Sequence, residues 1–161
     1  MPVNEATLAR RGLLFISDDR TLIDIELTHQ VLAASYWSPG IARQRVERGI
    51  ANSLCYGVYD QSRPRSSKTT LGTQVGFARV ITDAASFAYL CDVFIVESAR
   101  GGGVGTWLID TIVNHAPLCG LRRFCLMTRD AHGLYAKFGF TPMPDPTRYM
   151  ERVDRESYKQ A

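Results

Sequence analysis

The sequence predicts an α+β protein in which helices cover both faces of a central mixed, mostly antiparallel sheet. Strand patterns gather in the first half of the chain, whereas strand and helix patterns alternate in the second half. The connection Thr82–Ser86 between two strand patterns is short enough for antiparallel pairing. With 161 residues, 18.0 kDa and 45% hydrophobic residues, the chain (1–161) is expected to form one domain.

The first half of the chain supplies the expected helix pair. Leu13–Ser17 is predicted as a short first strand, and Asp24–Ser35 has apolar residues at helical spacing. Ser38-Pro39 matches an N-cap followed by proline at the first helical position, so a second helix is expected from there to Ile50. The polar, basic segment Asp60–Thr70 lies between two strand patterns and is predicted as an exposed hairpin loop. The strands that follow the helices are predicted at Leu54–Tyr59, Gln74–Ile81 and Phe87–Val96.

The second half of the chain alternates between strand and helix patterns. A glycine-rich turn at 101–105 leads into a helix that is expected to reach about His115. Arg123–Thr128 is predicted as a strand and Leu134–Phe138 as a short helix. A terminal strand is predicted at Tyr149–Val153, where it could pair or exchange between two copies of the chain in a homodimer.

Composition and charge exclude several classes of function. The net charge of +3, from 19 Lys and Arg against 16 Asp and Glu, is too small and too scattered for a nucleic-acid-binding protein, but it suits an anionic ligand. No stretch reaches the roughly 18 apolar residues of a membrane span, and the start lacks the apolar region of a signal peptide. A cytoplasmic protein with no membrane partner is therefore expected. No metal is expected either, because no CxxC pair and no His, Cys or Asp set with ligand spacing occurs.

The glycine-rich turn at 101–105 predicts a phosphate-binding site. It holds four glycines within five residues, between an apolar strand pattern and a helix pattern. Glycines let backbone N–H groups approach a ligand, the start of a helix favours negative charge, and Arg100 supplies a countercharge. A Walker A loop is excluded because Thr106-Trp107 stands where a lysine followed by Ser or Thr is required. A dinucleotide fingerprint is excluded because Arg122-Arg123 stands where an acid is required.

Two motifs resemble those of the GNAT superfamily of N-acetyltransferases. Arg100, Gly103 and Gly105 match the pattern Arg/Gln-x-x-Gly-x-Gly/Ala, which resembles the family's acetyl-CoA signature. A second segment resembles the family's later motif at Ala131, Tyr135, Lys137, Gly139 and Phe140. Together the motifs cover about residues 87–141, and the family's three-layer α/β/α fold agrees with the predicted elements. Thr128 departs from the pattern, since many members have asparagine there.

The resemblance implies an enzyme that transfers an acetyl group from the cosubstrate acetyl-CoA to a primary amine of a small molecule. Backbone N–H groups of the turn would hold the pyrophosphate, and the preceding strand would pair with the pantetheine arm through its backbone. Tyr135 corresponds to the tyrosine that reaches the CoA sulfur in many relatives, where it acts as a general acid. The implied cofactor-binding residues are Phe94, Ile95, Val96, Arg100, Gly101, Gly102, Gly103, Val104, Gly105, Thr106 and Tyr135.

Asp92 is a second candidate catalytic residue because it interrupts an otherwise apolar strand pattern. A carboxylate in such a run costs free energy unless it is paired or useful. Asp92 is expected either to bind or deprotonate the amine, or to pair with an arginine such as Arg79. Asp130 and His132 flank the second motif and are alternative candidates for the base. Trp37 is expected either to wall the acceptor pocket or to pack between the two helices.

Two other functions remain open at this point. One is a protein or peptide N-acetyltransferase, which would need an open groove in place of a closed pocket. The other is a CoA-binding sensor module without catalysis, although the retained Tyr135 and the complete glycine turn argue against a loss of activity.

Overall fold

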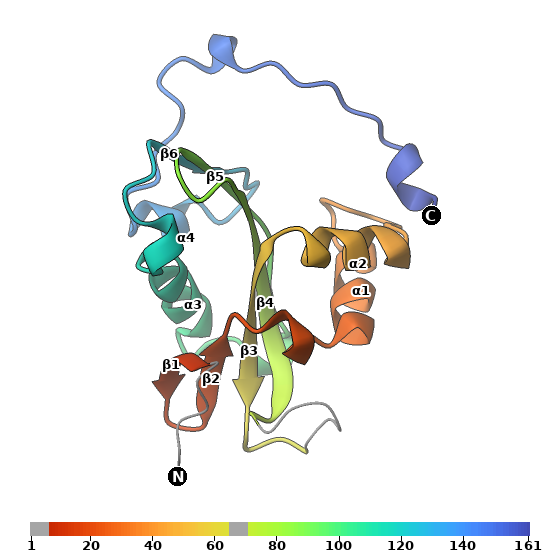
Figure 1. Cartoon of the computed structure of the whole chain (residues 1–161), viewed down its shortest axis with the longest axis vertical. Coiled ribbons are helices and arrows are strands. Elements are labelled where there is room, and N and C mark those ends of the chain that lie inside the picture. Colours follow the sequence, from red (N-terminus) through yellow and green to blue (C-terminus); the bar gives the residue numbers. More distant parts are fainter. Residues whose placement is uncertain (1–6, 65–70) are drawn as a thin grey trace.

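The computed structural model describes residues 7–64 and 71–161, which include a six-stranded sheet in the order β1-β2-β3-β4-β5-β6 (Figure 1). Every neighbouring pair of strands is antiparallel except β5 and β6, which are parallel. The expected mixed, mostly antiparallel sheet is therefore confirmed. The strands are β1 (Thr7–Arg11), β2 (Leu14–Ser17), β3 (Leu54–Asp60), β4 (Thr73–Thr82), β5 (Phe87–Ile95) and β6 (Arg123–Leu126).

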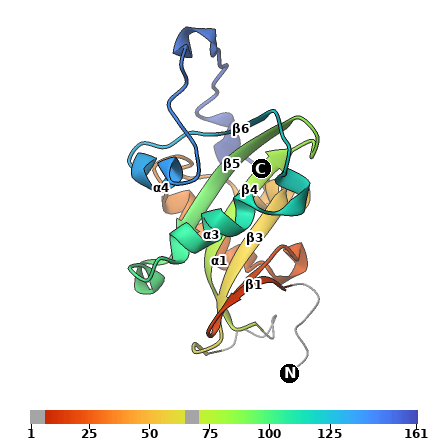
Figure 2. The ribbon, with the colours of Figure 1, turned by 90° about the vertical axis from the view of Figure 1, so that its left-hand side faces the viewer.

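Helices cover both faces of this sheet. Figure 1 shows α3 and α4 on one side of the strands and α1 and α2 on the other, and Figure 2 shows α3 lying across the sheet. The α+β class and its three layers are thereby confirmed. The helices are α1 (Ile25–Ala34), α2 (Arg43–Ala51), α3 (Val104–Val113) and α4 (His132–Ala136).

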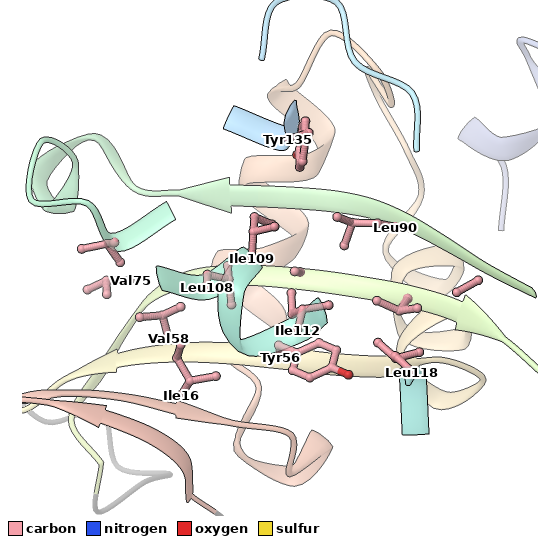
Figure 3. Close-up of a cluster of buried hydrophobic side chains, with 14 residues drawn as sticks. Ile16, Tyr56, Val58, Val75, Leu90, Leu108, Ile109, Ile112, Leu118 and Tyr135 are labelled. Atoms are coloured by element: carbon pink, nitrogen blue, oxygen red, sulfur yellow. The ribbon is translucent and has the colours of Figure 1, made fainter. Parts of the chain in front are cut away.

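Alternation along the strands divides the core into two layers. Tyr56 and Ala78 pack toward α3, whereas their neighbours Cys55 and Phe77 pack toward α1 and α2. Figure 3 shows the first layer, in which Leu108, Ile109 and Ile112 of α3 rest on the sheet. The second layer joins the helices α1 and α2 to the sheet through Leu32, Val46, Ile50 and Phe94.

The second helix begins later than the sequence predicts. It starts at Arg43, because Ser38 serves the end of α1 instead of the start of α2. The Ser38 hydroxyl donates to the carbonyl oxygen of Leu32 at 3.0 Å. Gly40 then takes a positive φ of 73° and its N–H donates to Ala33, so the chain turns before α2 can form.

The two ends of the described chain also differ from expectation. Thr7–Arg11 is a strand that the sequence analysis does not predict, and it forms a hairpin with β2. The terminal strand expected at Tyr149–Val153 is wrong, because this segment lies exposed and joins no strand of the described sheet. Part of the expected hairpin loop, residues 65–70, lies outside the described residues. Within the described ranges, no helix is long and apolar enough to cross a membrane.

Candidate active site

The candidate site lies where β5 separates from β6. The two strands pair only from Phe87 to Leu90 of β5, whereas β4 accompanies β5 as far as Ile95. The N–H of Val96 donates to Val75 on the β4 side at 2.9 Å. Because neighbouring residues of a strand direct their backbone groups to opposite edges, Ile95 faces the edge that β6 has left. The second half of β5 therefore has one edge, the edge away from β4, that is not paired with another strand.

A β-bulge at Asp92 marks this separation. Arg79 of β4 faces Cys91, and Phe77 faces Phe94, so two residues of β5 stand opposite one residue of β4. Asp92 has a φ of +55°, which is rare for a residue other than glycine and is best tolerated by Asn and Asp. The bulge directs the carboxylate toward the connection between α1 and α2, where it contacts Trp37.

Both oxygens of the Asp92 carboxylate accept a hydrogen bond. Arg79 donates its Nε–H to Oδ2 at 2.7 Å, and Trp37 donates its indole N–H to Oδ1 at 3.3 Å. The side chains of Arg79 and Asp92 are only 20% and 13% exposed. Burial alone would lower the pKa of Arg79, but the Asp92 carboxylate raises the pKa above its usual value. The pairing with Arg79, which the sequence left open, is thus present.

A cavity of about 560 Å³ brings Asp92 and Tyr135 to the same space. Its walls come from β5, the start of the loop after β6, α4, the α1–α2 connection and the end of the chain. Most of the side chains around it are aromatic or apolar. The aromatic residues are Tyr36, Trp37, Tyr89, Tyr135 and Tyr158. Asp130 and His132 do not line this cavity.

Tyr135 stands in α4 with only 8% of its surface exposed. Its ring packs edge-on against Phe140 at 6.0 Å, and it belongs to the core layer under α3 (Figure 3). Burial raises the pKa of its hydroxyl above the usual value, with smaller contributions from Tyr36 and Asp130. The hydroxyl therefore keeps its proton at neutral pH and is able to donate it.

The glycine turn presents the open start of α3. Gly101 and Gly103 have positive φ values of 88° and 71°, and Gly103 is the N-cap with no side-chain hydrogen bond. The first helical bond runs from the N–H of Trp107 to Gly103, so the N–H groups of residues 104–106 precede the helical ladder. A Cβ atom at Gly101 or Gly102 would meet nothing within 4 Å. The turn therefore has both the donors and the room for a phosphate group.

Comparison with a protein-family model decides the relationship. The model described as "Acetyltransferase (GNAT) domain" matches residues 51–142, which is more than half of the chain. The chain belongs to the GNAT acetyltransferase family.

Individual GNAT relatives agree with this assignment. A protein of Gibberella zeae that is named as an acetyltransferase is 33% identical over 144 residues, which cover 79% of this chain and 78% of the relative. A GNAT structure from Xanthomonas campestris pv. campestris is 42% identical and has a TM-score of 0.80. The alignment covers 91% of this chain and 97% of that structure's chain. An acetyltransferase structure with acetyl-CoA from Clostridium acetobutylicum has a TM-score of 0.58 at 17% identity, over 87% and 94% of the two chains, and shares the fold.

The two GNAT motifs thus lie on opposite sides of the gap between β5 and β6. Arg100 donates its Nε–H to the carbonyl oxygen of Ile95 at 2.9 Å, so its side chain follows the open edge of β5. Phe94 is buried, whereas Ile95 and Val96 are half-buried. Thr128, which replaces the asparagine of many GNAT members, accepts a hydrogen bond from the N–H of Ala131 at 3.0 Å and so supports the start of α4.

Arg11 is a residue that the sequence analysis misses. It lies at the end of β1, and its Nη2 donates to the carbonyl oxygen of Gly102 at 2.8 Å. Its guanidinium also lies over the ring of Trp107, 5.1 Å from the centroid. A second cation therefore stands beside the glycine turn. Gly12 lies between the basic pair Arg10-Arg11 and the apolar pair Leu13-Leu14. This glycine was the sequence feature that could have predicted the β1–β2 hairpin.

The remaining candidates for the base lie outside the cavity. Asp130 is exposed, and its Oδ2 lies 3.7 Å from Nη2 of Arg129. His132 is exposed at the start of α4. Across residues 7–64 and 71–161, no three His, Cys, Asp or Glu side chains gather as a metal site.

Proposed function

We propose that this GNAT protein transfers the acetyl group of acetyl-CoA to a primary amine of a small molecule, with residues 1–161 acting as one domain. The observation that carries this proposal is the cavity of about 560 Å³ shared by Asp92 and Tyr135, beside the gap between β5 and β6. Pockets for small ligands commonly measure roughly 300–1,000 Å³ and are lined by apolar and aromatic groups around a few polar ones.

The residues around the glycine turn fit acetyl-CoA as the donor. The turn has positive-φ glycines, open space above Gly101 and Gly102, and the N-terminus of α3, all of which favour an anionic pyrophosphate. Arg11, which bonds Gly102, and Arg100, which bonds Ile95, supply positive charge beside the turn. In the proposed complex the backbone of residues 94–96 and 101–106 binds the donor, which brings an activated acetyl thioester to the cavity.

Asp92 is proposed to hold the acceptor amine. A carboxylate that already receives hydrogen bonds from Arg79 and Trp37 is fixed in orientation, and both of its oxygens are engaged. These contacts favour a role in orienting the amine over that of a proton acceptor. Its position on the bulge, next to the open edge of β5, supports this role, because an amine bound there would lie beside the proposed donor site.

In the proposed reaction the neutral amine attacks the thioester carbonyl, the N–C bond forms as the C–S bond breaks, and the proton of the amine nitrogen passes to solvent. Tyr135 is proposed to donate a hydrogen bond or its proton to the CoA sulfur, and a donated proton is replaced from solvent. Because burial raises its pKa, the hydroxyl is neutral over the physiological range and is a donor. Tyr135 lines the same cavity as Asp92, which supports a division of roles in which Asp92 serves the acceptor and Tyr135 serves the leaving group.

The test is the incubation of the pure protein and acetyl-CoA with a panel of primary amines. The panel holds amino acids, amino sugars, polyamines and short peptides with a free N-terminus or lysine. Release of free thiol and a mass increase of one acetyl group on a small amine are expected. Acetylation of peptides alone would instead indicate a protein acetyltransferase. Binding of acetyl-CoA by calorimetry without any product would contradict the proposed reaction and indicate a CoA-binding module.

A further inference from the structure

A row of four contacting side chains lines the candidate cavity, from β5 to the loop after β6. At one end, the indole N–H of Trp37 donates to Oδ1 of Asp92 at 3.3 Å. The rings of Trp37 and Tyr36 meet edge to face, with their centroids 5.0 Å apart. At the other end, Cζ of Arg129 lies over the Tyr36 ring, 3.8 Å from the centroid. The row therefore has a carboxylate at one end, a guanidinium at the other, and two aromatic rings between them.

Arg129 is positioned by Tyr36, but its guanidinium is open to a ligand. The backbone N–H of Arg129 donates to the Tyr36 hydroxyl at 3.3 Å, so one tyrosine contacts both the backbone and the side chain of this arginine. Its Nη2 lies 3.7 Å from Oδ2 of Asp130, which is beyond hydrogen-bond distance. In the two described stretches of the chain, no oxygen accepts a hydrogen bond from the Arg129 guanidinium. The donors of this group are thus available inside a built wall.

The charges around the cavity do not cancel. Asp92 and Arg79 form an ion pair at 2.7 Å, so together they carry no net charge. Arg129 adds one positive charge to the lining. Its neighbour Asp130 does not line the cavity, and solvent screens this pair because both side chains are 65% exposed. A second ammonium group on an acceptor would be repelled by Arg129, whereas an anionic group would be attracted.

We propose that the acceptor is an amine with a carboxylate or phosphate group at the opposite end of an apolar body, and that Arg129 binds this anionic group. The inference rests on the proposed function, in which Asp92 holds the amine. A guanidinium pairs through two parallel hydrogen bonds with a carboxylate or a phosphate. The rings of Tyr36 and Trp37, which are 46% and 43% exposed, lie between the two charged ends and offer an apolar surface to the body of the acceptor. Arg129 is thus a residue that determines specificity, and polyamines are poor acceptors.

Matched acceptors measure the contribution of the anionic group. In each pair a methyl group replaces the carboxylate: ε-aminocaproate is compared with hexylamine, and para-aminomethylbenzoate with para-methylbenzylamine. The kcat/KM of each acid is expected to exceed that of its methyl partner by about tenfold or more, as expected for one added charge-assisted contact. Aminopentyl phosphate in the same assay distinguishes a phosphate from a carboxylate, and diaminohexane should be a poorer acceptor than hexylamine. Equal values for the acids, the phosphate and the methyl partners would overturn the proposal.

Arg129→Gln tests whether this residue causes the preference. The ratio of kcat/KM between an acid and its methyl partner should fall about tenfold in this variant. Arg122→Gln is the matched control, because Arg122 is also exposed but does not line the cavity, and the ratio should stay as in the wild type. Melting curves of both variants check that the fold is retained. An unchanged ratio in Arg129→Gln would overturn the role of Arg129.

Binding without turnover separates this inference from the proposed function. Calorimetry with ε-aminocaproate and hexylamine should find tighter binding of the acid, and the difference should shrink about tenfold in Arg129→Gln. That result without any acetylated product would reject the proposed function and retain the role of Arg129. If the acid and its methyl partner bind alike, or if the acid binds Arg129→Gln as tightly as the wild type, the role of Arg129 is wrong even where other amines are acetylated.

Discussion

The two halves of β5 differ in their neighbours. The first half, Phe87–Leu90, is paired on both edges, with β4 on one side and β6 on the other. The second half, Asp92–Ile95, is paired only with β4 and follows a bulge. Tyr89 and Leu90 of the first half also line the cavity, but only the second half carries Asp92 and leads into the glycine turn. The site is thus made by the loss of one strand neighbour.

One residue, Asp92, connects these two halves. Its positive φ produces the bulge, and its carboxylate ties β5 to β4 through Arg79 and to the helix pair through Trp37. A plain strand would pass the same point with its side chains alternating regularly and would not direct a carboxylate there. Substitutions on the donor side and the acceptor side of Asp92 should therefore have separable effects.

The largest effect is expected on the donor side, from Gly103→Asp. It places a negative charge and a side chain at the N-cap of α3, where the pyrophosphate is proposed to bind. The Kd for acetyl-CoA, measured by calorimetry, should rise about 100-fold, which corresponds to the loss of two charge-assisted hydrogen bonds of about 1.5 kcal/mol each. Gly120→Asp is the matched control, since Gly120 also has a positive φ, of 79°, and open space around it. Equal affinity in the two variants would contradict the assignment of the turn.

Tyr135→Phe should have the next largest effect, on turnover. It keeps the ring and removes the proposed donor to sulfur, so kcat and kcat/KM should fall together by about tenfold or more, with acetyl-CoA affinity unchanged. Tyr56→Phe is the control, because the Tyr56 hydroxyl bonds His115 at 2.8 Å outside the cavity. That variant should lose about 1 kcal/mol of stability and no turnover.

The pH profile gives a second check on Tyr135. Burial raises its pKa above the ordinary value of 10.0, so the protonated donor is retained as the pH approaches that value and is lost only beyond it. No loss of kcat from this group is expected below about pH 10, since a hydroxyl donates only while it is protonated. A loss of kcat near neutral pH that disappears in Tyr135→Phe would contradict this role.

On the acceptor side, Asp92→Asn should raise the KM for the amine about fivefold, because one charge-assisted hydrogen bond becomes a neutral one. Asn tolerates the positive φ, so the bulge should persist. Arg79→Met removes the same ion pair and leaves the carboxylate in place. Steady-state kinetics should show a larger change in KM for Asp92→Asn than for Arg79→Met. Equal changes would mean that Asp92 acts only by holding the strand.

The donor side could be predicted from the sequence because its parts are contiguous. Strand, glycine turn and helix follow one another from Phe94 to Thr106, and local backbone chemistry determines their geometry. The acceptor side depends on contacts between distant positions. Trp37 precedes its partner Asp92 by 55 positions, and no local pattern relates them. Tyr158 reaches the cavity from the far end of the chain, and the sequence carries no signal for that contact.

The error at the start of α2 has a more local cause. Serine followed by proline is favourable before a helix, but a serine hydroxyl also serves the carbonyl groups at the end of one. Ser38 does the latter, because its neighbour in space is Leu32 of α1. The residue type was informative, but the Ser-Pro pair alone does not distinguish the end of one helix from the start of the next, and Ser38 contacts a carbonyl only six positions before it. Asp92 could likewise be identified as unusual from the sequence. The sequence could not decide between pairing with Arg79 and a catalytic role, and it did not predict the bulge.

The smallest effect is expected from Arg11→Gln, which tests whether the first hairpin takes part in donor binding. Arg11 bonds Gly102 at 2.8 Å and lies over Trp107, so its charge stands beside the proposed phosphate site. Because the residue is exposed, the Kd for acetyl-CoA should rise only about threefold, and the difference should shrink as salt screens the charge. Arg10→Gln is a close control on the same strand, since Arg10 bonds Gly12 at 3.0 Å and lies over Phe15. Calorimetry at low and high ionic strength should find a salt-dependent loss only for Arg11. If both variants bind alike, the hairpin supports the glycine turn mechanically and contributes no charge to the donor site.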